Sequence, residues 1–234
     1  LFYRVEASLR GLAAARARGL EARLTLAGWI SAEARTRCQD LAGELGIAEA
    51  VGLTGSYHGL TGGAASVTFG KGRRGYGPAV PGALAIPAPN CYRCPIRHCT
   101  DSCDMSCLEA GFDLVDRQST GSLAAMIAEP IQGVAGFVTP PDGFFGAMKE
   151  VLDRYGILFI SDEVQTGWGR TGEHFWGYQA HGFTPDLLTF AKGIGNGLSI
   201  GGVVASAEIM ESYSALGIST FGGNPLATAG ALAN

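Results

Sequence analysis

The stretch LLTFAKGIGNG, residues 187–197, decides the fold class of this chain. A short apolar run, Leu187–Ala191, is followed by Lys192 and a glycine-rich turn, which is typical of a strand that ends in a loop. In α/β enzymes such strand ends carry the chemistry. The other two lysines, Lys71 and Lys149, lie in a Gly/Arg-rich loop and on the polar face of an expected helix. A lysine held beside apolar neighbours can lose its proton and attack a carbonyl carbon, so Lys192 is a candidate nucleophile.

Apolar runs and helical periodicities alternate along the second half of the chain. The runs predict strands over residues 123–128, 157–161, 187–191 and 202–205. The spacing of apolar residues predicts a helix from Phe144 to Tyr155, closed by Gly156, and another helix over residues 207–215. Strands that alternate with helices indicate an α/β fold, in which a mostly parallel sheet is flanked by helices.

The predicted strand at residues 157–161 ends in Asp162 and Glu163. A carboxylate after one strand and a lysine after a later strand are what pyridoxal phosphate requires. The carboxylate would keep the ring nitrogen protonated by charge pairing, and the amine would bind the aldehyde. Taken alone, Asp162 could instead cap a helix or a turn. Glu129, which follows the strand at 123–128, is a second strand-end acid.

Composition excludes several classes of protein. The chain has 234 residues, of which 47% are hydrophobic and 16% are charged, as expected for a globular protein with a sizeable core. The net charge of -4 favours no nucleic-acid partner. No apolar stretch is long enough to span a bilayer, and no signal peptide is visible, so we expect a cytoplasmic protein. We expect an atypical helical N-terminal segment over residues 1–54, with helices at 5–18 and 32–45, and a loop-like connection over residues 70–110.

Five of the six cysteines cluster in that connection, at Cys91, Cys94, Cys99, Cys103 and Cys107. Clustered thiols without a secretory signal indicate reduced cysteines or a metal site rather than a disulfide framework. The spacing, with a histidine at position 98, permits zinc ligation. The sequence leaves both alternatives open, zinc or a loop of free thiols.

Several segments together carry a family resemblance. DEVQTGWGRTG at residues 162–172, FAKG at 190–193 and TFGGNP at 220–225 resemble motifs of the class III aminotransferases, which are pyridoxal phosphate enzymes of fold type I. The resemblance covers roughly residues 55–234. It implies that these residues form the cofactor-binding large domain, in part, and that the smaller C-terminal domain is absent. We therefore expect an incomplete chain.

The resemblance also implies roles for single residues in holding the cofactor. Lys192 would bind the aldehyde as an imine and later carry the proton, and Asp162 would pair with the ring nitrogen. Val164 would pack on one ring face and Tyr57 on the other, while Gln165 would reach the ring hydroxyl. As alternatives, Tyr57 could be an ordinary core aromatic and Gln165 could satisfy backbone groups only.

Three further positions follow from the same resemblance. Thr220 would donate to the cofactor phosphate, in this family across a homodimer interface, although it could simply cap a turn. Glu129 would lie near the substrate and the cofactor ring. His58, in the Tyr-His-Gly motif, is expected at the cofactor as a hydrogen-bonding residue rather than a catalytic one. No metal is expected at this site.

The expected reaction transfers an amino group from an amino acid or amine to a 2-oxo acid. Relatives that act on ornithine or 4-aminobutyrate carry a glutamate where this chain has Val134, so the resemblance is greater to the alanine–glyoxylate branch. Other parts resemble the 2,2-dialkylglycine decarboxylases. A lyase acting on a phosphorylated amine, or a non-catalytic remnant, stays open, because residues 1–50 show no Ser/Gly/Thr-rich turn for the cofactor phosphate.

Overall fold

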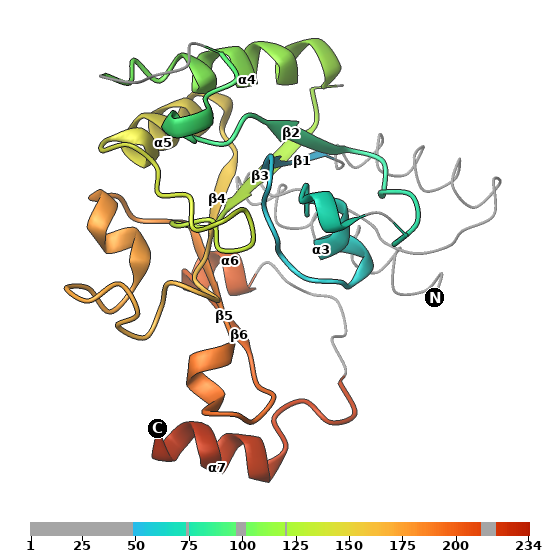
Figure 1. The fold of residues 1–234 in the computed structure, drawn as a ribbon. Coiled ribbons are helices and arrows are strands. Elements are labelled where there is room, and N and C mark those ends of the chain that lie inside the picture. The colour runs from blue at the N-terminus through green and yellow to red at the C-terminus, as the bar shows by residue number, and fades with distance from the viewer. Residues whose placement is uncertain (1–48, 74, 97–101, 120, 212–218) are drawn as a thin grey trace, which may run out of the picture.

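The computed structural model describes residues 49–234, except residues 74, 97–101, 120 and 212–218. Its centre is a six-stranded sheet with the order β2-β1-β3-β4-β5-β6 (Figure 1). The strands are β1 (Glu49–Leu53), β2 (Ala83–Ile86), β3 (Leu123–Ala128), β4 (Leu158–Asp162), β5 (Leu187–Phe190) and β6 (Gly202–Ala205). The first five run parallel, and β6 is antiparallel to β5. The predicted α/β class with a mostly parallel sheet is confirmed.

In the described residues, five α-helices and four short 3-10 helices lie between these strands or follow the last of them. The α-helices are α3 (Gly62–Ser66), α4 (Ser106–Gln118), α5 (Phe144–Tyr155), α6 (Ala207–Glu211) and α7 (Pro225–Ala233) in the described part of the chain. The 3-10 helices are η1 (Lys71–Arg73), η2 (Cys91–Arg93), η3 (Gly177–His181) and η4 (Lys192–Gly195). Because the parallel strands all end at the same edge of the sheet, the residues after β3, β4 and β5 share that edge.

Helix α5 has the bounds that its apolar periodicity predicts. It runs from Phe144 to Tyr155, and Gly156 ends it in the left-handed conformation, with its amide donating to the carbonyl of Leu152. A residue without a Cβ adopts that conformation at little cost, which is why the helix stops there. Its buried face lies against the sheet next to β4.

Aromatic rings fill the space between α5 and the sheet. The ring of Phe145 lies 5.4 Å from Phe144, 5.9 Å from Phe159 on β4 and 5.4 Å from Phe183, measured between ring centroids. Phe145 is only 1% exposed. This cluster fixes α5 on β4 and therefore supports the end of β4.

Helices α4 and α5 lie side by side in Figure 1. The ring of Phe112 on α4 is 5.3 Å from that of Tyr155 on α5, and the Tyr155 hydroxyl donates to the carboxylate of Asp116 at 2.7 Å. Burial and the hydrogen bond to Asp116 raise the pKa of Tyr155 to about 12. The hydroxyl therefore keeps its proton and this contact at neutral pH.

The prediction of a loop over residues 70–110 is wrong. This segment contains β2 and the first residues of α4, as well as η1 and η2. The run Ala83–Ile86 has only four apolar residues and lies close to prolines on both sides, so it gives no clear strand pattern in sequence. Helix α4 packs directly on β2, where a Cβ added to Gly111 would lie 2.7 Å from the Cβ of Ile86. That contact requires glycine at position 111.

The first described residues also differ from the prediction. Residues 49–53, expected in the helical N-terminal segment, form β1, which pairs with β2 and β3 inside the sheet. The helices expected at 5–18 and 32–45 lie outside the described residues. Helix α6 confirms the start of the one expected at 207–215, whose last residues are also outside them. The division into segments 1–54 and 55–234 stays a prediction.

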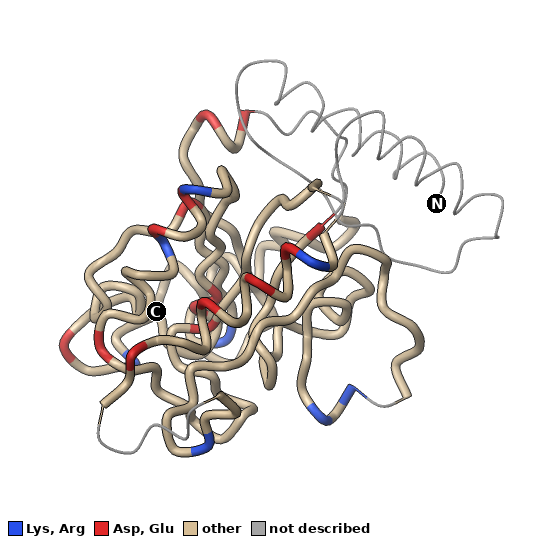
Figure 2. The backbone as a smooth tube through the Cα atoms, turned by 90° about the horizontal axis from the view of Figure 1, so that it is seen from above, with Lys and Arg blue, Asp and Glu red and all other residues tan. Residues whose placement is uncertain are grey.

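Charges are dispersed over the described chain. In Figure 2, Lys and Arg positions lie scattered among Asp and Glu positions. In the part of the chain that the structure describes, no helix is both long and apolar enough to cross a membrane.

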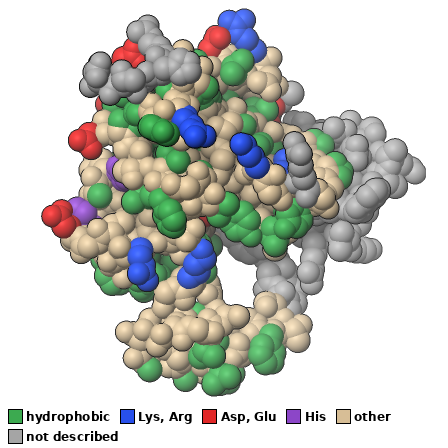
Figure 3. Space-filling model, in the orientation of Figure 1, with side chains coloured by type: hydrophobic (Ala, Val, Ile, Leu, Met, Phe, Trp, Pro, Cys, Tyr) green, Lys and Arg blue, Asp and Glu red, His purple; other side chains and the backbone are tan. Residues whose placement is uncertain are grey.

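The surface over α7 is unusually apolar. Figure 3 shows hydrophobic side chains at the lower end of the molecule, where α7 lies. Leu226 is 70% exposed, Leu232 85% and the preceding Phe221 78%. Such a set of exposed large side chains marks a surface that another polypeptide can cover.

His181 makes the stability of the fold depend on pH. Its ring packs against Phe145 at 4.9 Å, and burial lowers the pKa of His181 below its usual value. The unfolded chain therefore takes up a proton before the folded chain does, and stability contributed by the neutral ring is lost as the pH falls through about 6.5.

We expect that a His181→Gln variant loses less free energy of unfolding than the unaltered chain between about pH 7 and pH 5. Urea unfolding gives the free energy of unfolding of both proteins at each pH. The difference between the two proteins reports on His181, because the carboxylates are the same in both. Parallel pH profiles would contradict the assignment.

Candidate active site

Asp162 is the last residue of β4, and both of its carboxylate oxygens are hydrogen-bonded. Oδ2 accepts from Nδ1 of His58 at 2.7 Å, and Oδ1 accepts from the amide of Val164 at 3.1 Å. Asp162 is 5% exposed, and the His58 side chain is 1% exposed. The structure thus holds a buried carboxyl group with a hydrogen-bond partner on each oxygen at the end of a central strand.

Glu129 follows β3, the neighbour of β4, and it lies in the same region. Its Oε1 accepts from the amide of Tyr57 at 3.0 Å, and its Oε2 accepts from the amide of Gly133 at 2.9 Å. Burial raises the pKa of Glu129 above its usual value, and the charge of Asp162 adds to this, against the lowering effect of the two amides. Glu129 therefore takes up a proton more readily than a carboxyl in water.

Val164 and Gln165 lie in the turn directly after β4, and both are half-buried. The Gln165 side chain lies across Gly133, since a Cβ built on that glycine would be 2.0 Å from Nε2 of Gln165. No other residue type fits at position 133 without moving this amide. The side-chain amide of Gln165 thus connects the segment after β4 with the segment after β3.

Lys192 begins η4, two residues after β5, which is paired with β4. The register opposes Asp162 to Thr189, so the lysine is three residues further along the neighbouring strand. Lys192 is exposed and has a left-handed backbone, with a φ of 49°. A non-glycine residue in this conformation at a strand end is an uncommon and costly arrangement, of the kind that clusters at functional sites.

Thr220 is not brought together with the others. It is exposed in the segment that leads into α7, and within the described residues it makes no hydrogen bond to Tyr57, His58, Glu129 or Asp162. Tyr57 is 36% exposed, which argues against the alternative of an ordinary core aromatic. Among the predicted site residues, hydrogen bonds join Asp162 to His58 and Val164, and Glu129 to Tyr57.

Two residues of this edge were not singled out from the sequence. Gln132 is 1% exposed, and its Nε2 donates to the carbonyl of Thr54 at 3.1 Å. Glu163 is fully buried and accepts four hydrogen bonds. An acid next to Asp162 was visible in the sequence, but its partners at residues 177 and 178 are too distant along the chain to be inferred.

The donor set at this edge fits pyridoxal phosphate. A buried carboxylate is held at the end of β4, and an exposed amine follows the adjacent strand. Nε2 of His58 is buried and has no hydrogen-bond partner within the described residues. This nitrogen could therefore form a hydrogen bond to a bound molecule at this edge. The segment expected to lack a phosphate turn, residues 1–50, lies almost entirely outside the described residues.

The cysteines form no metal site in the described chain. Cys91, Cys94, Cys103 and Cys107 form no disulfide bond with one another, and Cys99 lies outside the described residues. No three His, Cys, Asp or Glu side chains are arranged to hold a metal ion where the structure describes them. Burial raises the pKa of the Cys107 thiol to about 11, so it stays protonated at neutral pH.

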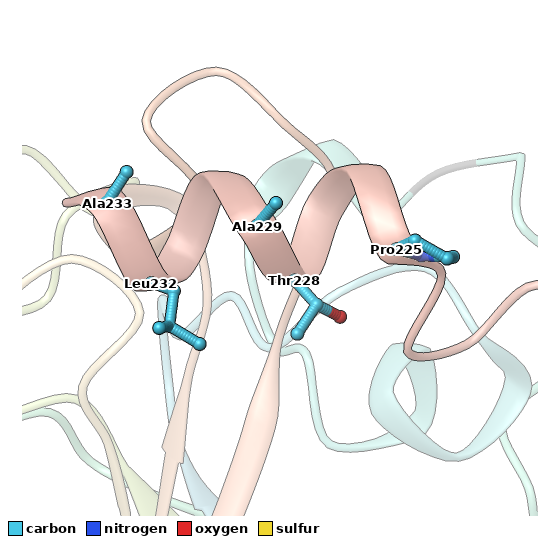
Figure 4. A pocket seen from close by; sticks show the side chains of 5 residues that line it. All are labelled: Pro225, Thr228, Ala229, Leu232 and Ala233. Atoms are coloured by element: carbon cyan, nitrogen blue, oxygen red, sulfur yellow. The ribbon is translucent and has the colours of Figure 1, made fainter.

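A shallow surface pocket lies away from these acids, on α7. It is lined by Pro225, Thr228, Ala229, Leu232 and Ala233, which Figure 4 shows along one side of the helix. The pocket holds no titratable side chain, and none of the predicted site residues lines it. We therefore place the candidate active site at the ends of β3, β4 and β5 instead.

The described sheet, five parallel strands and one antiparallel strand flanked by helices, has the fold of the transaminases that it resembles in structure. The chain belongs to the class III aminotransferases, because the model of that family matches residues 27–234. This confirms the resemblance found in the sequence motifs.

Known proteins of this kind are similar over most of the chain. A leucine/methionine racemase of Thermococcus litoralis is 45% identical over 186 residues, which cover 76% of this chain and 41% of the relative. The human mitochondrial alanine–glyoxylate aminotransferase 2 is 38% identical over 203 residues, covering 76% of this chain and 39% of the relative. A crystal structure of an (S)-enantioselective omega-transaminase from Thermomicrobium roseum has a TM-score of 0.72 and 34% identity, and the match covers 98% of this chain and 48% of that one. The chain thus spans less than half the length of each of these proteins.

Proposed function

We propose that this chain forms the cofactor-binding large domain of a pyridoxal phosphate-dependent transaminase. The observation that carries the proposal is the parallel pairing of β4 with β5, because the buried Asp162 ends β4 and Lys192 follows β5. When bound, the cofactor supplies an electron sink for negative charge at the α-carbon of a substrate.

Individual residues would hold the cofactor, orient its ring or move a proton. Asp162 would hold the ring nitrogen in its protonated form, and His58 would keep this carboxylate charged and oriented through the bond from Nδ1. Lys192 would attach the cofactor through Nζ and afterwards move a proton at the α-carbon of the substrate. Val164 and Tyr57 would enclose the ring, and Gln165 would reach its hydroxyl.

Substrates and assembly are further parts of the proposal. We expect an alanine-like amino donor and glyoxylate or pyruvate as the 2-oxo acid acceptor, in line with the human relative and with Val134 in place of a glutamate. We expect a homodimer in which Thr220 serves the cofactor phosphate of the partner subunit. The exposure of Thr220 supports that role. A cytoplasmic location is also part of the proposal.

Reductive trapping tests the central assignment. The chain is incubated with pyridoxal phosphate, reduced with borohydride and digested, and the labelled lysine is identified by mass spectrometry. Since the chain contains only three lysines, Lys71 and Lys149 serve as internal controls. We expect the label predominantly on Lys192. Equal labelling of all three lysines would contradict the proposal.

A second candidate function is amino acid racemisation. It is favoured by the 45% identity to the leucine/methionine racemase. The same residues would remove a proton at the α-carbon and return it to the opposite face, without a 2-oxo acid. Chiral chromatography of L-leucine or L-methionine after incubation with the loaded protein separates the two. Inversion without an acceptor indicates a racemase, and consumption only in the presence of glyoxylate indicates a transaminase.

A further inference from the structure

Glu163 is a fully buried carboxylate for which the proposed chemistry has no use. Its oxygens accept from the amide of Gly177 at 2.7 Å and from the amide of Tyr178 at 2.8 Å. They also accept from the hydroxyl of Ser161 at 3.2 Å and from the hydroxyl of Thr166. Charge-assisted hydrogen bonds of this kind are about twice as strong as neutral ones. The carboxylate therefore ties residues 177 and 178 to the end of β4.

The backbone of Glu163 adds two more connections. Its amide donates to the carbonyl of Thr189 on β5 at 2.8 Å, and its carbonyl accepts from the amide of Gly167 at 2.9 Å. One residue thus joins β4, β5, the first turn of the following loop and the start of η3. The Glu163 side chain therefore holds both ends of the 164–176 loop, through the hydroxyl of Thr166 at one end and the amide of Gly177 just after the other.

The closed loop carries the tryptophans that pack beside the lysine turn. The ring of Trp168 lies 4.9 Å from that of Trp176 and 5.4 Å from that of Phe190. A Cβ built on Gly193, the residue after Lys192, would lie 3.0 Å from Cδ1 of Trp168. Trp168 therefore forms a wall directly against the turn that follows the lysine.

The residues between Glu163 and the two tryptophans are tightly packed. A Cβ on Gly167 would lie 2.6 Å from the ring of Trp176, and one on Gly177 would lie 2.6 Å from the Cβ of Thr166. Tightly packed groups of this kind transmit a displacement instead of absorbing it. A shift of Gly177 away from Glu163 must therefore move the tryptophans.

We propose that Glu163 is a positioning residue, which fixes the 164–176 loop and thereby holds Trp168 against the turn that begins at Lys192. Glu163 acts through Trp168 and touches neither substrate nor cofactor. Its consequence for amino transfer rests on the proposed function, but its effect on the lysine turn does not. A merely structural role would stabilise the loop and leave the turn unchanged.

Hydrogen exchange of the full chain without cofactor distinguishes the two roles. A Glu163→Gln variant keeps the shape of the side chain but turns an NH2 group toward an amide donor. We expect the amides of Gly177 and Tyr178 to exchange roughly ten- to a hundredfold faster in this variant. The proposal further requires faster exchange at Asn196 and Leu198, whose amides bond to the carbonyls of Gly193 and Gly195 in the lysine turn. Faster exchange at residues 177 and 178 alone would overturn it.

Two further variants keep the test decisive. Asp186→Asn is the matched control, because Asp186 also accepts from a backbone amide, that of Phe159 at 2.7 Å, and because this partner and its ion-pair partner Lys149 both lie outside the 164–176 loop. In this control, the amide exchange rates of Asn196 and Leu198 should not increase relative to those of the rest of the sheet. If Glu163→Gln does not fold, Trp168→Ala removes the link itself and must accelerate the same two amides; unchanged exchange there would overturn the proposal.

The catalytic consequence is measured separately. In protein loaded with pyridoxal phosphate, Glu163→Gln should lower kcat about ten- to a hundredfold with little change in KM, because the amine is misplaced while the substrate contacts remain. Glu163→Asp should restore part of this loss, since it keeps the charge. If the unaltered chain is not trapped on Lys192, the proposed function fails, whereas the exchange result still decides the role of Glu163.

Discussion

Replacing Asp162 with asparagine is expected to lower kcat/KM for amino transfer by about a hundredfold to a thousandfold. Asp162, which carries the carboxyl group, is only 5% exposed. An amide of the same shape has no charge to hold a proton on the cofactor ring. It would also lose the acceptor of the His58 Nδ1–H bond, or turn an NH2 group toward it. Both effects should lower the rate of amino transfer beyond any loss of stability.

Initial rates with an amino donor and a 2-oxo acid, for the Asp162→Asn variant and the unaltered chain, check this expectation. Asp113→Asn is the matched control, because Asp113 is an exposed acid on α4 that pairs only with Arg117. It should change the rate less than about twofold. An Asp162→Asn protein with the rate of the control would remove Asp162 from the site.

Replacing Phe145 with alanine is expected to lower the free energy of unfolding by about 3–5 kcal/mol. The ring is 1% exposed and lies within 6 Å of the rings of Phe144, Phe159 and Phe183. Removing it leaves a cavity between α5 and β4 that these stiff rings cannot fill. Because β4 ends at Asp162, the loss should also loosen the site.

Urea unfolding followed by circular dichroism measures the difference. Phe137→Ala serves as the control, because Phe137 is 77% exposed, and its removal should change stability by less than about 0.5 kcal/mol. A similar loss in both variants would mean that the cluster around Phe145 does not form the core.

The second half of the sheet was predictable because its apolar runs are continuous and bounded. The strand at 123–128 and the helix at 144–155 have the predicted bounds, and Gly156 marks the helix end in the sequence itself. Strand β2 was not predictable, since four apolar residues near prolines do not differ from a loop. Strand β1 was missed because a glycine interrupts its run and because it is stabilised by partners about 33 to 75 residues away.

Sequence motifs indicated the candidate site residues more specifically than local patterns did. The strand-end positions of Asp162 and Lys192 follow from their own neighbours in the sequence. The hydrogen bond between His58 and Asp162 joins residues 104 positions apart, and no local pattern indicates it. The same holds for the amides of Gly177 and Tyr178 on Glu163, since a buried acid can be recognised only when its donors are known.

The contact between α4 and β2 limits how this chain can diverge. At Gly111 the helix backbone reaches the side chain of Ile86 so closely that no Cβ fits between them. A descendant can enlarge position 111 only if position 86 shrinks in compensation, so these two sites should change as a pair. Ile86 is the last residue of β2 and therefore lies at the same carboxyl edge of the sheet as the candidate site, where Gly133 and Gln165 are under a similar joint constraint.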